Sequence, residues 1–101
     1  MLTVSAVRLT TPEWERIVRL GTERHAQELE NELKTVRERI AAFERKYGQS
    51  LAQLQRVGLP DDAGLEAHED YVEWCSWQGR EAELMEKLQG VYAIAGYGDG
   101  G

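Results

Sequence analysis

Apolar residues in the middle of the chain recur at alternating steps of four and three. The run comprises Leu29, Leu33, Val36, Ile40, Phe43 and Tyr47. This spacing places every member on one side of an α-helix, which then packs lengthwise against another helix. The pattern returns near the C-terminus in Trp74, Trp77, Leu84, Leu88, Val91 and Ala95. The sequence therefore predicts two long amphipathic helices that form an antiparallel, coiled-coil-like hairpin.

The first helix has clear start and stop signals. Thr10 and Glu13 have the spacing of a capping box, and Pro12 between them suits a first helical turn. Gly48 is expected to end the helix in a left-handed conformation. Gly21 leaves two alternatives, because the later apolar pattern does not project back onto Val18. Either the helix is continuous and its apolar face changes register, which we favour, or it breaks near Gly21.

Shorter elements connect the two long helices. Ser50 is expected to cap a short helix that carries Leu51 and Leu54. Residues 58–64 contain two glycines, a proline and two aspartates, which are typical of a turn. The second long helix is predicted from about Leu65 to Ala95, and a small residue within it at Gly79 would let a neighbour pack closely.

The ends of the chain have a different character from its middle. Residues 1–9 alternate apolar and polar side chains, so we expect a strand that pairs with a second copy or another protein, or else a free arm. Residues 96–101 include four glycines and are expected to form a disordered tail. The predicted fold is thus a single all-α domain over residues 10–95, with an N-terminal strand or arm.

Charge is distributed unevenly along the 101 residues. The net charge is −6, and residues 48–101 account for −7 of it while residues 1–47 carry +1. An acidic half attracts a basic partner and repels nucleic acid, although it also keeps a protein in solution. The single cysteine, Cys75, excludes an internal disulfide and agrees with a cytoplasmic location. No apolar stretch has the length of a membrane span, and no signal peptide is recognised.

Residues with catalytic chemistry are present but poorly spaced for a reaction. His68 and Cys75 lie seven residues apart, roughly 10 Å along a helix, which is too far for a direct hydrogen bond. Neither His68 nor His25 has the glutamate three residues earlier that helical di-iron sites use. No glycine-rich phosphate loop occurs. We therefore expect no enzyme, no cofactor and no metal site.

Aromatic and acidic side chains cluster on the second long helix. Tyr71, Trp74 and Trp77 follow one another at steps of three, so they form a broad stripe. Tryptophan and tyrosine dominate the energetics of protein interfaces. One interpretation makes this stripe, with neighbouring acidic residues, the site that binds a partner protein; the other places the aromatic rings in the core of the hairpin. The acidic residues of this candidate site are Glu66, Asp70 and Glu73.

Two segments carry a resemblance to a known group of proteins. The chain resembles small, acidic, helical prokaryotic proteins, many of which are antitoxin components of toxin–antitoxin operons. The resemblance is carried by residues 43–48 with Ser50 and Leu51, and by residues 68–74 after an acidic turn. The resemblance covers about residues 26–90. It implies a cytoplasmic, non-enzymatic protein that binds and neutralises a partner, such as a basic toxin. It implies no catalytic residues.

Two other functions remain as alternatives. Many such antitoxins carry a ribbon–helix–helix segment, in which paired strands enter the major groove of DNA. Here residues 1–25 would provide it, with Thr3, Ser5 and Arg8 at the dimer or DNA contact and a turn at Gly21. The net negative charge argues against nucleic acid as a partner. The other alternative is a structural or adaptor subunit of a larger assembly, and in each case we expect a homodimer.

Overall fold

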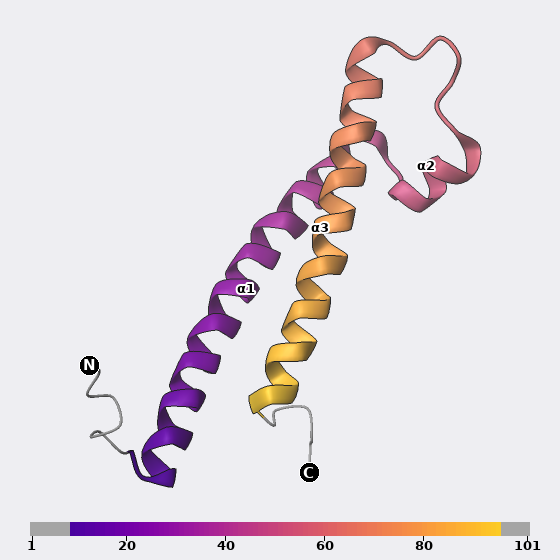
Figure 1. Cartoon of the computed structure of the whole chain (residues 1–101). Helices are drawn as coiled ribbons and strands as arrows, with labels where there is room; N and C mark the ends of the chain where they lie inside the picture. The colour runs from indigo at the N-terminus through magenta and orange to yellow at the C-terminus, as the bar shows by residue number, and fades with distance from the viewer. Residues whose placement is uncertain (1–8, 96–101) are drawn as a thin grey trace, which may run out of the picture.

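Three helices make up the described part of the chain. The computed structural model describes residues 9–95, which form α1 (Thr11–Tyr47), α2 (Leu51–Val57) and α3 (Leu65–Ala95). Figure 1 shows α1 and α3 lying antiparallel, with α2 beside their connected end. The predicted all-helical hairpin with a short connecting helix is therefore confirmed. The expected strand or arm, apart from Leu9, and the expected tail at 96–101 lie outside the described residues.

The helix ends are fixed by the residues that the sequence singled out. Thr10 and Glu13 form a reciprocal capping box at the start of α1, and Ser50 and Gln53 form another at the start of α2. Gly48 ends α1 with φ +67°, a conformation that side chains with a Cβ rarely adopt. The N–H of Gly48 donates to the carbonyl of Glu44, which satisfies one carbonyl of the last turn.

The first helix continues through Gly21 without a break. Residues 11–47 form one α-helix, and the hydroxyl of Thr22 donates to the carbonyl of Val18 within it. The favoured alternative, a continuous helix with a change of register, is the one found. No turn exists at Gly21 of the kind that a ribbon–helix–helix segment would need.

Two hydrophobic clusters hold the hairpin together. The first lies in the middle of α1 and α3 and consists of Ala26, Leu29, Leu33, Val36, Ile40, Leu84 and Leu88. The second lies at the connected end, where Leu51 and Leu54 of α2 pack on Trp74 of α3. Phe43 and Tyr47 from α1 border that second cluster. The same seam that the apolar spacing predicted thus joins α1 to α3, and α2 covers its end.

The molecule is elongated because two long helices form most of it. Its principal extents are 69 × 40 × 18 Å and its radius of gyration is 21.0 Å. None of the helices in residues 9–95 combines the length and the apolar character that crossing a membrane requires. Gly79 of α3 is exposed, and a Cβ placed there would meet nothing within 4 Å. The expected close-packed neighbour at Gly79 is therefore not an element of the described chain.

Candidate partner-binding site

The structure divides the aromatic stripe of α3 between core and surface. Trp74 is 0% exposed and lies in the second cluster, where its ring stacks on Phe43 and Tyr47 at centroid distances of 5.6 and 5.7 Å. Its indole Nε1 is buried and has no hydrogen-bond partner among the described residues. Trp74 therefore takes the core alternative, and its assignment as a partner anchor is corrected: a helix has only one side facing α1, and Trp74 is on it.

Tyr71 and Asp70 also serve the hairpin. Tyr71 is half-buried and packs against the second cluster. Asp70 accepts hydrogen bonds at 2.5 Å from both Lys46 Nζ and Tyr47 Oη, and only 17% of its side chain is exposed. These contacts join the last turn of α1 to the first turns of α3.

The electrostatics of this junction follow from the same contacts. The hydrogen bond from Lys46, followed by that from Tyr47, lowers the pKa of Asp70 below its ordinary value of 3.8. The pKa of Lys46 is raised, chiefly by its hydrogen bonds to Asp70 and Glu66. Burial, followed by the hydrogen bond to Asp70, raises the pKa of Tyr47. The junction is thus a charged pair at neutral pH, with the tyrosine protonated.

Of the other three predicted residues, Glu66 and Glu73 are exposed, whereas Trp77 is half-buried and packs against the first cluster. The side chain of Glu66 is 77% exposed, although one carboxylate oxygen lies 2.5 Å from Lys46 Nζ. Glu73 is exposed and accepts a hydrogen bond of 3.0 Å from Nε1 of half-buried Trp77. The guanidinium of Arg39 lies 5.9 Å from the centre of a Trp77 ring. Trp77 therefore presents one edge at the boundary between α1 and α3.

Together with two neighbours these residues form a continuous surface, which we call the acidic face. It consists of Glu66, Glu69, Val72, Glu73 and Trp77 of α3. Val72 is 68% exposed, and Glu69 is exposed beside it. Residues three and four apart on a helix are neighbours, so the three carboxylates form a row with one apolar side chain on each side. This arrangement suits contact with a surface that is basic and partly apolar.

Sequence reasoning did not include Glu69 or Val72 in the candidate site. The position of Val72 can be derived from the helical period. Trp74, Leu84 and Leu88 define the side of α3 that faces the core, and the period then places Val72 on the opposite side. The aromatic residues were included because large rings commonly contribute to interfaces. Val72 was not, because its exposure depends on which side of α3 the other helices cover.

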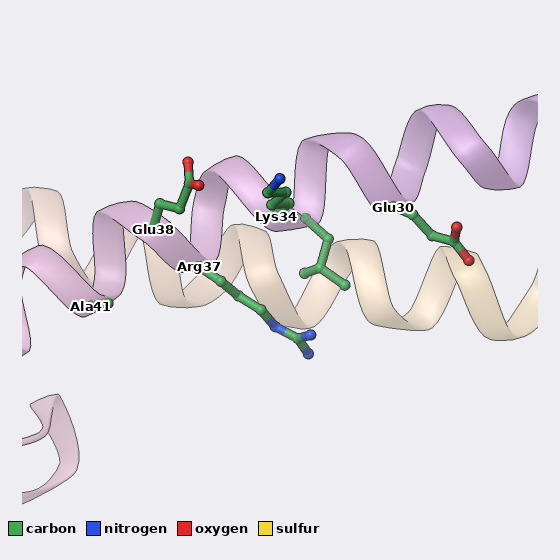
Figure 2. A pocket seen from close by; sticks show the side chains of 6 residues that line it. Glu30, Lys34, Arg37, Glu38 and Ala41 are labelled. Carbon is green, nitrogen blue, oxygen red and sulfur yellow. The ribbon is translucent and has the colours of Figure 1, made fainter.

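Two grooves flank the seam between α1 and α3. One, of about 620 Å³, lies beside Trp77 and is lined also by Arg80, which donates hydrogen bonds to Glu32 of α1 and to Glu83. The second, of about 500 Å³, is formed mainly by the surface of α1 (Figure 2). There Arg37 reaches across to α3, where its Nε donates to Glu81 at 3.0 Å. Both grooves are thus bordered by charges paired across the seam, and only the first adjoins the acidic face.

Other candidates for chemistry are dispersed. His68 is exposed, and Cys75 is half-buried with the amide of Gln55 3.8 Å from its sulfur. Within residues 9–95 no group of three or more His, Cys, Asp or Glu side chains is placed to hold a metal ion. Thr3, Ser5 and Arg8, the alternative dimer or DNA contacts, lie outside the described residues.

Comparisons of this chain with protein-family models, with curated proteins and with solved structures found no match.

Proposed function

We propose that this chain binds another protein without catalysing a reaction, and that it acts as an antitoxin-like protein which neutralises its partner. The acidic face is the contact surface in this proposal. The observation that carries it is a row of three exposed carboxylates, Glu66, Glu69 and Glu73. Exposed Val72 lies on one side of the row, and Trp77, which α1 covers in part, lies on the other. The resemblance of residues 26–90 to antitoxin proteins supplies the more specific part of the proposal.

The chemistry of the acidic face favours a basic partner. A row of carboxylates attracts lysine and arginine side chains over a distance and speeds association, while apolar contacts slow dissociation once water is excluded. Val72 and the edge of Trp77 provide those apolar contacts. Covering the basic active surface of a toxin would block its substrate. A cytoplasmic location is part of the same proposal.

The first experiment identifies the partner and then tests its toxicity. The tagged full chain is expressed in its native host, and proteins that co-purify in stoichiometric amounts are identified by mass spectrometry. The partner is then expressed alone and together with this chain while growth is followed. Growth arrest by the partner alone, relieved by co-expression, is the expected result.

Variants connect that result to the acidic face. Val72→Lys, and separately the pair Glu69→Lys and Glu73→Lys, are expected to abolish both co-purification and rescue. Glu38→Lys is the matched control, because Glu38 is exposed on α1 beside the other groove (Figure 2). Rescue that survives the acidic-face variants would contradict the proposed surface. A stoichiometric partner without any effect on growth would exclude the antitoxin and favour the adaptor-subunit alternative.

A further inference from the structure

A second apolar surface lies on the N-terminal part of α1. We call it the N-terminal apolar face; its members are Trp14, Ile17, Val18 and Leu20, each between 46% and 54% exposed. Ile94, in the last turn of α3, lines a groove with Trp14 and Val18 of α1, and the first turns of α1 extend past the end of α3 (Figure 1). A groove of about 410 Å³ lies between Trp14, Val18 and Ile94, and Ile94 is itself 73% exposed.

The direction of this face explains why α3 leaves it open. At 3.6 residues per turn, the mean direction of the four side chains differs by roughly 110° from that of the buried residues Ala26 to Ile40. Because α1 is continuous through Gly21, this change of register turns the apolar face away from the seam. A longer α3 along the same seam would therefore still leave Ile17 and Leu20 uncovered. The apolar pattern at this end is suited to a helix other than α3.

We propose that the N-terminal apolar face is a homodimer interface, in which α1 of a second copy packs antiparallel across it. Charge complementarity favours both this occupant and its direction. Glu13 and Arg24 lie at opposite ends of the face and on the same side of it. Each also has a partner within its own chain: Glu13 belongs to the capping box, and the Arg24 guanidinium lies 3.6 Å from Glu28. Two antiparallel copies place Glu13 of each beside Arg24 of the other, whereas parallel copies place like charges together.

The small residue in this segment fits the same arrangement. Gly21 is exposed, and a Cβ built on it meets nothing within 4 Å of its own chain. With the two-fold axis near Ile17 and Val18, Trp14 of one copy lies over Gly21 of the other. A bulky ring against a glycine lets two helices approach closely. Each copy thus contributes the ring of Trp14 and the space at Gly21, and the two are complementary across a two-fold axis.

The association state tests the proposal directly. Sedimentation equilibrium of the full chain is expected to give a species of twice 11.5 kDa. Ile17→Glu should raise the dimer dissociation constant by at least about tenfold, because it places charge at the centre of the interface. Val72→Glu, the same kind of change on the acidic face, should leave the dimer intact. Since Ile17 is half-exposed, far-UV circular dichroism of Ile17→Glu should retain the helical signal.

Two outcomes would overturn the inference. A monomer at all concentrations would leave residues 1–8 or a different protein as the occupant of this face. A dimer that tolerates Ile17→Glu would place the interface elsewhere. Because the acidic face is a separate surface, either outcome leaves the proposed partner function standing, and failure of the partner experiment leaves the dimer standing.

Cross-linking tests the direction of packing. In a Cys75→Ser background, Ile17→Cys lies near the two-fold axis and should form a disulfide-linked dimer under mild oxidation. His25→Cys should not, because antiparallel packing separates the two copies of that position by about 22 Å at 1.5 Å per residue. Efficient cross-linking of His25→Cys would overturn the antiparallel arrangement in favour of a parallel one.

Discussion

At the scale of single residues, Trp74 organises the connected end of the hairpin. It receives Phe43 and Tyr47 from α1 and Leu51 and Leu54 from α2, so one side chain joins three helices. The sequence showed that α3 carries aromatic residues at steps of three. It did not show which of them is buried, because positions three apart differ by only about 60° around a helix. The packing of α1 and α2 around Trp74, through contacts distant in sequence, decides which ring is buried.

Replacing Trp74 tests its structural role. Trp74→Ala is expected to lower the free energy of unfolding by about 3–5 kcal/mol, as removal of a buried aromatic ring does. Trp74→Phe should cost less than half as much, because it retains a stacked ring and removes an indole N–H that lacks a partner. Val72→Ala, at an exposed position, should change stability by no more than about 0.5 kcal/mol. Urea denaturation followed by circular dichroism measures all three, and a small effect of Trp74→Ala would contradict the buried position.

Asp70 predicts a dependence of stability on pH. Its pKa is lowered in the folded chain, so its contribution is present above the ordinary value of 3.8 and is lost as the pH falls through the folded-state pKa. Lys46 stays charged throughout this range. Asp70→Asn is therefore expected to lower the urea midpoint at pH 7, and the difference from the unmodified protein should shrink as the pH falls below the ordinary value of 3.8. Glu38→Gln is the control, and an equal deficit for Asp70→Asn at both ends would show that the ion pair is not responsible.

At the scale of elements, helix boundaries were predictable because their signals are local. The caps at Thr10, Gly48 and Ser50 each depend on a few neighbouring residues, and the structure forms all three. The continuity of α1 across Gly21 was harder to predict, because a glycine weakens a helix without necessarily ending it. The acidic face was only partly predictable for a related reason: the exposure of Val72 depends on which side of α3 the other helices cover.

Two glycines with different conformations provide an element-scale prediction. Gly79→Ala should raise the free energy of unfolding by about 0.5–1 kcal/mol, because the position is helical, exposed and free of steric conflict. Gly48→Ala should lower it by about 1 kcal/mol, because φ +67° is strained for alanine. Thermal and urea denaturation report both changes. Destabilisation by Gly79→Ala would indicate that something outside the described chain packs on this position.

At the scale of the whole molecule, the two hydrophobic clusters divide the hairpin into a middle and an end. The seven residues of α2 are held mainly through Leu51 and Leu54, whereas the middle of α1 is held by the interhelical seam. Short elements with few buried contacts open locally at lower free energy than the global unfolding transition. We therefore expect α2 to open without the hairpin separating.

Hydrogen exchange separates these two events. Relative to the unmodified protein, Leu54→Ala is expected to speed hydrogen exchange of the amides of α2. The exchange rates of the amides of residues 29–40 should not change. The physical reason is that Leu54 belongs only to the second cluster. Mass spectrometry with peptide resolution makes the measurement. Equal acceleration in both segments would mean that the two clusters unfold as one cooperative unit.

The elongated shape has a consequence for how the protein behaves in a column. A compact chain of 101 residues has a radius of gyration of about 13 Å, compared with 21.0 Å here. Frictional drag and exclusion from porous beads depend on the hydrodynamic radius, which an elongated shape increases, so a single copy elutes as if it were a heavier globular protein. Calibration against spherical standards would thus overestimate the mass of a single copy, and a true dimer joined by the antiparallel N-terminal segments of α1 would elute like a still larger assembly.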